Sequence, residues 1–354
     1  MIPEQLFGLA TGMGSLPHGT VEEALAIVLK YFQALPHWPQ LPRRGTAEGL
    51  VAQNLAPLLQ RGLVAFTPNG SPYFDQDSPG WEERCLQFYE LLLAVDTDGT
   101  GLEEFAFPAD AAAGFYAFAD HPEQLPSSAR CVKGQLVGPV SLGFQVTDPQ
   151  KKPSFYNPSL REILVKTLAA HARWQTERLR GTGLPALVFV DDPGLYSYGS
   201  SSAVGLGRAE IESALAEIVA AIHGAGGLAG VHCCAGTDWS LLLELPLDVV
   251  SFDAYGYFPS MQVYAEALGS FLKRGGALAW GIVPTSEKVL QEDAGTLQRL
   301  LAREIETLAR QGVDETLLRR QLLITPSCGT GTLTPELAER IYRLTASLAE
   351  SLQK

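Results

Sequence analysis

The sequence predicts an α/β fold, a single (β/α)8 TIM barrel over residues 1–354 with loop insertions at its catalytic face. Apolar, β-rich runs alternate with amphipathic helical runs, which indicates a parallel sheet with crossover helices. Eight such units favour a closed barrel over an open doubly wound sheet. A chain of 354 residues with 46% hydrophobic and 18% charged residues suits one such domain with a large buried core.

The first half of the chain supplies four of the eight units. Its first helix is expected after Gly19, because Thr20 and Glu23 have the spacing of a capping box. The expected strands are 8–15, 62–68, 131–140 and 185–192, and the later helices are 80–95, about 159–180 and 208–227.

The second half repeats the pattern more regularly. The expected strands are 228–234, 247–254, 277–283 and 321–327, and the main helices are 293–311 and 335–352. Two segments interrupt the repeat: a Pro-rich loop at about 35–49 and a long insertion at about 99–126. We expect both to lie over the mouth of the barrel.

Composition excludes several classes of partner. The formal net charge is −13 with no basic stripe, which argues against a nucleic-acid partner. No apolar run approaches the roughly 18 residues that a membrane span needs, and we expect no signal peptide at the N-terminus. Five cysteines do not suggest a disulfide framework. We therefore expect a cytoplasmic protein.

Residues able to bind a metal follow several predicted strands. The C-terminal ends of barrel strands form the catalytic face, and "VHCC" places His232 and Cys234 on one side of a strand with Cys233 on the other. Cys328 follows the last strand, which gives two thiolates and one imidazole, a set that suits Zn²⁺. Asp253 can add a carboxylate. The alternative is that these cysteines are ordinary core residues.

Three further polar residues lie at strand ends, each with two interpretations. Asp191 and Asp192, in "VDDPG", can bind an amino group or act as a base, or can cap a turn or helix. Ser15, in "GMGSLP", can bind a substrate carboxylate or can be a turn serine.

The order of these motifs resembles a known family. "MGSLP", "GPVS", "VDDPG", "HCC" with "DVVSFD", and "TPSCGTGTLTPELA" occur in the order seen in cobalamin-independent methionine synthases. From about residue 8 to 350 the chain is similar to the catalytic C-terminal barrel of that family, within the uroporphyrinogen-decarboxylase-like group. The resemblance implies a zinc-dependent methyltransferase that transfers a methyl group to the thiol of homocysteine and so makes methionine.

The resemblance also implies roles for single residues. His232, Cys234 and Cys328 would bind zinc, and Asp253 stands where the family has a Glu ligand, with Glu244 a weaker substitute. Asp191 would contact the substrate amino group. Ser15 would lie near the amino-acid end of the substrate, and Asp192 is a further substrate-binding candidate. Homocysteine would displace a labile ligand such as Asp253 or a water.

The methyl donor and the acceptor remain open. The chain is too short for the additional N-terminal barrel of the full-length enzymes, which favours a methylated corrinoid (methylcobalamin) or a corrinoid protein as donor over methyl-folate. One alternative is a zinc-dependent alkyltransferase acting on another small thiol such as coenzyme M. A non-catalytic zinc- or corrinoid-binding protein is an alternative of another class. Decarboxylation of tetrapyrroles would leave the His and Cys set unexplained.

Overall fold

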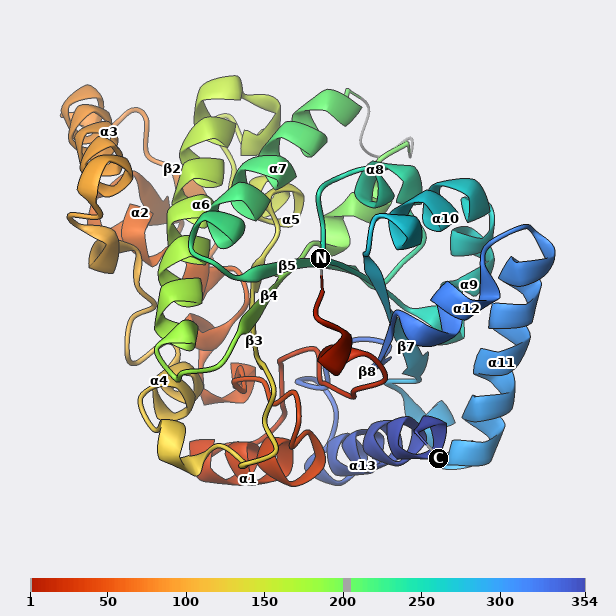
Figure 1. Cartoon of the computed structure of the whole chain (residues 1–354). Coiled ribbons are helices and arrows are strands. Elements are labelled where there is room, and N and C mark those ends of the chain that lie inside the picture. The colour runs from red at the N-terminus through yellow and green to blue at the C-terminus, as the bar shows by residue number, and fades with distance from the viewer. Residues whose placement is uncertain (1, 200–204, 354) are drawn as a thin grey trace.

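A curved parallel sheet is the centre of the fold. The computed structural model describes residues 2–199 and 205–353. Within these residues six parallel strands pair in sequence order, and helices surround the curved sheet (Figure 1). The strands are β3 Val132–Val137, β4 Ala186–Asp191, β5 Leu228–Cys233, β6 Val249–Phe252, β7 Ala277–Val283 and β8 Leu322–Pro326. All six lie within the predicted runs.

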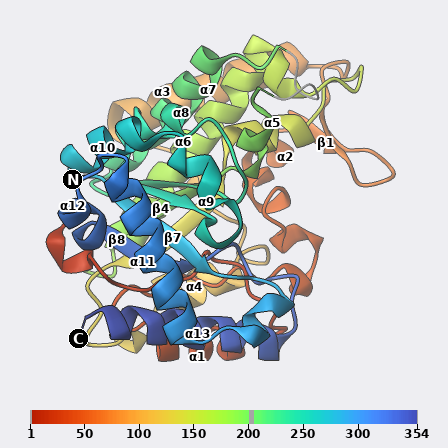
Figure 2. The same ribbon diagram turned by 90° about the vertical axis from the view of Figure 1, so that its right-hand side faces the viewer.

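Helices connect the strands and cover the outer face of the sheet, as the side view also shows (Figure 2). Thr20 caps the first helix as predicted, because its hydroxyl accepts a hydrogen bond from Glu23 N at 3.3 Å. The α-helices of the described residues are α1 Val21–Tyr31, α2 Ala56–Gln60, α3 Trp81–Asp98, α4 Ala113–Ala119, α5 Pro139–Gln145, α6 Pro158–Arg180, α7 Arg208–Gly224, α8 Trp239–Leu243, α9 Ala254–Gln262, α10 Ala265–Lys273, α11 Ala294–Arg310, α12 Glu315–Arg320 and α13 Pro335–Leu352.

The predicted first strand, 8–15, is not a regular strand. It runs beside β8, where Thr11 N donates to Ile324 O at 3.1 Å, but only an isolated bridge at Ala10 is formed. Gly14 has a φ of 137°, a conformation that favours glycine and interrupts a ladder. A Cβ at this position would lie 2.6 Å from the Gln135 side chain, so the close approach also requires glycine.

The predicted second strand, 62–68, is wrong as a member of this sheet. Its centre forms β1 Val64–Phe66, which pairs antiparallel with β2 Pro72–Phe74 in a separate two-stranded sheet. Residues 36–40 of the Pro-rich loop instead lie at the edge of the main sheet. Trp38 N donates to Lys133 O at 3.3 Å, and Gln40 N donates to Gly14 O at 3.1 Å. Prolines within this loop remove N–H donors, which limits the pairing to isolated bridges.

The insertion at 99–126 packs on the outside of the molecule. It contains α4, which contacts α1, and a short 3-10 helix that contacts α6. Trp174 Nε1, on α6, donates to Glu103 Oε2 at 2.9 Å. This insertion therefore covers the outer side of α6, which differs from the predicted position over the mouth.

Alternate residues of the strands face two separate cores. Leu187 and Phe189 belong to the inner core, which the N-terminal residues Leu6 and Leu9 help to fill, whereas Val188 belongs to the outer core under the helices. Figure 1 shows the N-terminal segment inside the curve of the sheet. Among the described residues, no helix combines the length and the apolar character that crossing a bilayer requires.

Candidate metal centre

Three polar side chains at neighbouring strand ends point to the inner side of the sheet. Asp191 on β4 pairs in register with His232 on β5, and His232 pairs with Ser251 on β6. Residues two positions earlier on β4 and β6, Phe189 and Val249, belong to the inner core. Since side chains alternate along a strand, Asp191, His232 and Ser251 share that inner side.

Two cysteines complete a compact cluster with His232. Cys234 follows the end of β5 and Cys328 follows the end of β8. One ligand atom from each of the three residues lies within 4.8 Å of the other two, and this is the one group of its kind among the described residues. Cys233 belongs instead to the outer core and is fully buried. His232 and Cys234 therefore lie on one side of the chain and Cys233 on the other, which is the arrangement that the alternation of side chains along a strand predicts.

Ser251 fixes the orientation of the His232 ring. The Ser251 hydroxyl points toward Met13 Sδ at 4.0 Å, so its oxygen is free to accept a hydrogen bond from His232 Nδ1 at 3.0 Å. With the ring proton on Nδ1, Nε2 carries a lone pair. Nε2 is buried and has no hydrogen-bond partner among the described residues. A metal-binding histidine has this arrangement, with one nitrogen oriented by a hydrogen bond and the other free for the metal.

The two cluster thiols affect each other's ionisation. The hydrogen bond with Cys328 lowers the pKa of Cys234, and the neighbouring imidazole of His232 acts in the same direction. The same interaction with Cys234 raises the pKa of Cys328, and burial adds to that rise. One proton is therefore shared by two sulfurs. A bound cation would replace this proton and allow both sulfurs to be thiolates.

Asp253 lies near this cluster but serves another contact. It caps α9, where its Oδ1 accepts from Gly256 N at 2.7 Å. Burial raises the pKa of Asp253 to about 6, while the charges of His232 and Cys234 also act on it. Its role as a metal ligand stays a prediction. Glu244 is an exposed residue whose carboxylate pairs with Arg208 at 2.8 Å, so it is occupied elsewhere.

Asp191 presents an unsatisfied carboxylate oxygen beside the cluster. Its Oδ1 is buried without a hydrogen-bond partner among the described residues. Burial raises the pKa of Asp191 to about 6, and the charge of Lys133 opposes that rise. Lys133 is itself fully buried, and its Nζ donates to Met13 O at 2.9 Å. Burial lowers the pKa of Lys133 to about 8, so a cation lies inside the curve of the sheet close to Asp191.

Asp192 has its oxygens occupied by the protein. Oδ2 accepts from Val140 N at 2.9 Å, and Oδ1 accepts from Ser141 N and Ser141 Oγ at 2.8 and 2.6 Å. The side chain is fully buried, and burial raises its pKa to about 6 against the effect of the Ser141 hydrogen bonds. This geometry holds the turn between β3 and α5. Asp192 therefore fits the second interpretation of "VDDPG", in which a carboxylate stabilises a turn.

Ser15 lies next to the loop that carries Cys328. Its hydroxyl accepts from Gly331 N at 3.3 Å, and its carbonyl accepts from Thr330 N at 3.0 Å. A Cβ on Gly329 would lie 2.2 Å from Ser15 Oγ, which shows how closely the two segments approach. Ser15 therefore lies near the His232, Cys234 and Cys328 cluster and anchors the loop of Cys328, while a contact with a substrate stays a prediction.

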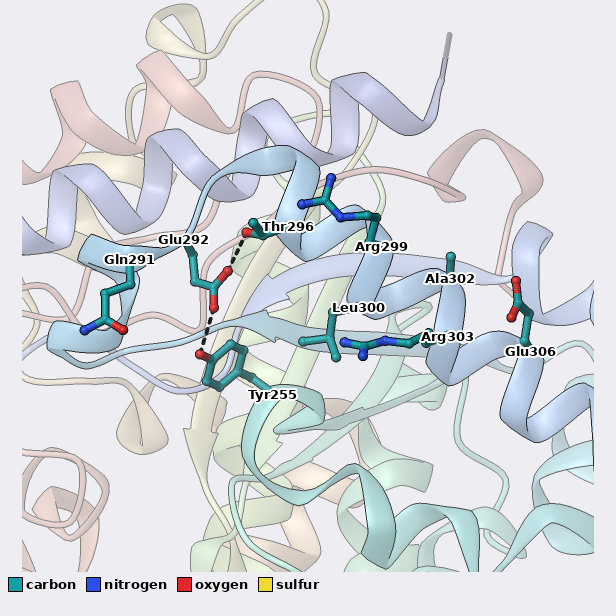
Figure 3. Close-up of a pocket in the computed structure, with 9 residues that line it drawn as sticks. All are labelled: Tyr255, Gln291, Glu292, Thr296, Arg299, Leu300, Ala302, Arg303 and Glu306. Carbon is teal, nitrogen blue, oxygen red and sulfur yellow. Dashed lines mark hydrogen bonds between the residues drawn. The ribbon is translucent and has the colours of Figure 1, made fainter.

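A surface groove of about 950 Å³ lies apart from this cluster (Figure 3). It is formed between Tyr255 at the start of α9 and one side of α11, and none of the cluster residues lines it. Tyr255 OH donates to Glu292 Oε1 at 2.9 Å, and the Thr296 hydroxyl donates to the same carboxylate. These contacts join α9 to the start of α11. This groove and the His232, Cys234 and Cys328 cluster are thus at different places.

Comparisons with known proteins give no family for the chain. No family model and no curated protein matches it. Among solved structures, the chain is similar to a GH113 beta-mannanase from Alicyclobacillus acidocaldarius in complex with ManMIm. The identity is 12%, the TM-score is 0.40, and the match covers 98% of this chain and 97% of that chain. A likeness at this level assigns no activity to the chain.

These comparisons correct the predicted identity. Neither the family models nor the curated proteins return a methionine synthase. Membership of the cobalamin-independent methionine synthase family is therefore not upheld. The predictions of homocysteine methyltransfer, of alkyl transfer to another thiol and of a non-catalytic zinc- or corrinoid-binding protein fall with it. Methylcobalamin, methyl-folate and a corrinoid protein stay untested predictions.

Two residues of the site were missed from the sequence. Ser251 orients His232, and Lys133 places a buried cation near Asp191. The available signal was a polar residue within an otherwise apolar run, namely the serine of "DVVSFD" and the lysine of "CVKGQLV". Both residues face the inner side of the sheet, where a polar side chain needs a specific partner.

Proposed function

We propose that the strand ends hold a zinc ion through His232 Nε2, Cys234 Sγ and Cys328 Sγ. The observation that carries this proposal is the convergence of three ligand atoms within 4.8 Å from β5 and from the loop after β8. The free, buried Nε2 of His232 supports it independently. Two thiolates and an imidazole are soft and borderline ligands, which suit zinc better than magnesium or calcium.

The proposed activity is that of a zinc-dependent enzyme acting on a small ligand. Structural zinc sites are closed by four protein ligands, whereas three protein ligands leave a position for water or substrate. When bound in such a site, zinc acts as a Lewis acid that polarises a ligand and favours loss of its proton. The largely buried Asp191 and Asp253 lie beside the cluster and are suitable groups to take up that proton.

The other residues of the site have supporting roles in this proposal. Ser251 holds the His232 ring in position, and the inner core beneath the cluster excludes water from one side. Ser15 fixes the loop of Cys328 through the hydrogen bonds to Thr330 and Gly331. All five cysteines are free, and we propose a reducing compartment such as the cytoplasm, where the ligand thiols stay reduced.

We further propose that the curved sheet is closed into an eight-membered barrel by residues 8–15 and 36–40. Gln40 N donates to Gly14 O, and Leu16 N donates to Gln40 O at 2.9 Å, so the two segments are linked to each other as well as to β8 and β3. Slow hydrogen exchange of these two amides, comparable with that of β5, is the expected result. Fast exchange at both would show that the ring is open there.

Zinc content of purified protein tests the metal site. The wild type is expected to hold one zinc ion per chain, and His232→Ala and Cys328→Ala are expected to lose it. Cys233→Ser is the matched control, because Cys233 is adjacent to Cys234 but faces the outer core. Circular dichroism of each variant would show that the fold is retained. Wild-type protein without zinc after expression in zinc-supplemented medium would refute the proposal.

Cobalt substitution tests the exchangeable position. Tetrahedral Co²⁺ bound by thiolates gives visible absorption, and added small anions or a change of pH should shift these bands when the fourth position is open. Bands that respond to neither would indicate a closed site and would contradict the proposed enzymatic role.

A further inference from the structure

We propose that Cys234 and Cys328 form an intramolecular disulfide when the metal is absent, so that oxidation switches the candidate metal centre off. This inference rests on the proposed function, since it describes the regulation of the same site. It concerns a pair of thiols that are 94 positions apart in the sequence but face each other at the strand ends.

The two sulfurs are close enough to be joined by small movements. Their Sγ atoms are at most 4.8 Å apart, and a disulfide needs a separation of about 2.05 Å. Cys234 lies one residue beyond the end of β5, and Cys328 lies two residues beyond the end of β8. Neither residue is held within the strand ladder, so rotation of the two side chains and a slight shift of the loops can bring the sulfurs together.

Access distinguishes this pair from the other cysteines. Cys234 and Cys328 are both partly exposed, so a small oxidant can reach them. Cys131 and Cys233 are fully buried. Cys85 is also partly exposed, but it lies on α3, which is at the outer edge of the molecule (Figure 1). Cys234 and Cys328 are therefore the one pair of neighbouring thiols that an oxidant can reach. Cys85, which is reachable but alone, and Cys233, which is adjacent but buried, serve as internal controls.

Hydrogen peroxide is a sufficient oxidant for the reaction. One thiolate attacks a peroxide oxygen, the O–O bond breaks, and the products are a sulfenic acid and a hydroxide that takes up a proton to become water. The second thiolate attacks the sulfenic sulfur, the S–S bond forms, and the S–O bond breaks to release hydroxide, which takes up a proton and becomes the second water. Two thiols lose two electrons in total, and one peroxide is reduced to two waters.

The disulfide removes two of the three proposed ligands at once. Neutral disulfide sulfurs do not replace thiolates as zinc ligands, because the thiolate is the form that binds metal. A bound cation conversely holds both sulfurs as ligands and makes them less available to the oxidant. Metal binding and disulfide formation should therefore exclude each other. Bound metal protects the two thiols from oxidation, and the disulfide prevents metal binding until a reductant restores the thiols.

Peptide mapping by mass spectrometry of the full chain tests the inference. Chelator-treated wild type exposed to hydrogen peroxide should yield a cross-linked peptide pair containing Cys234 and Cys328, and neither of these two thiols should then react in a titration under denaturing conditions. Dithiothreitol should restore all five thiols. Zinc-loaded protein should lose these thiols at least about tenfold more slowly, because both sulfurs are then metal ligands.

Substitution of either cysteine tests whether the cross-link joins these two residues. Cys328→Ser should leave Cys234 without its partner, so that peroxide gives a sulfenic acid detectable with dimedone, and Cys234→Ser should do the same at Cys328. A cross-link between Cys233 and Cys234, or oxidation without any cross-link in the wild type, would overturn the inference.

The two proposals fail separately in this experiment. If wild type binds no zinc but the cross-link of Cys234 with Cys328 forms, the disulfide inference holds and the zinc proposal fails. If zinc binds through the cluster but the chelated protein forms no such cross-link, the inference is overturned and the metal proposal stands.

Discussion

Glu304 is a buried carboxyl group whose protonation should control how stability depends on pH. It lies on α11 with 5% of its surface exposed, and its Oε2 has no hydrogen-bond partner among the described residues. Burial and, to a smaller extent, the charge of Asp253 raise the pKa of Glu304 to about 9, against the effect of Arg303. The folded protein therefore keeps this group neutral at pH 7, whereas the unfolded chain ionises it.

The sign and size of the effect follow from proton binding. Between the ordinary Glu pKa of 4.5 and the folded value of about 9, the folded state holds one proton more than the unfolded state. The free energy of unfolding therefore falls as pH rises, by about 1.36 kcal/mol per pH unit. Across pH 5 to 8 this single group should remove about 4 kcal/mol of stability.

The variant Glu304→Gln replaces the ionisable group by a neutral one of nearly the same shape. Urea denaturation at pH 5 and pH 8 should show the variant gaining about 4 kcal/mol relative to wild type over that interval, because only the wild type loses stability through this group. Glu306→Gln is the matched control, since Glu306 is on the same helix but exposed. Parallel pH dependence of wild type and Glu304→Gln would refute the reasoning.

Two further substitutions test contacts at the site. Ser251→Ala removes the hydrogen-bond acceptor of His232 Nδ1, so zinc affinity measured by chelator competition should fall by about 10- to 100-fold. An unchanged affinity would show that the ring is oriented without Ser251. Asp192→Asn replaces an acceptor of three hydrogen bonds from Val140 and Ser141, so the free energy of unfolding should fall by about 1–3 kcal/mol in urea denaturation. A change near zero would mean that this network adds no stability.

Most of the sheet could be predicted because buried parallel strands have a local signature. The run predicted as 277–283 coincides with β7, and all seven of its residues are buried. The segment 8–15 was harder, because its glycines allow it to lie beside β8 without forming a regular ladder. Residues 36–40 give the opposite signal, since prolines indicate a loop although the segment lies at the sheet edge. In both segments the structure depends on contacts with the neighbouring strands, and these contacts are not encoded in the local sequence.

The candidate site shows which kind of information a sequence carries. The alternation of side chains along one strand correctly separates Cys233 from His232 and Cys234, because that rule needs only local geometry. The contact between His232 and Ser251 depends on the register of β5 against β6, which no short motif specifies. The order of motifs along the chain can likewise predict that certain side chains come together, but it does not specify the reaction in which they take part. The His and Cys cluster is formed here, while the comparisons do not uphold the predicted methionine synthase family. Chemistry at this centre therefore has to be established from metal binding and ligand exchange at His232, Cys234 and Cys328 themselves.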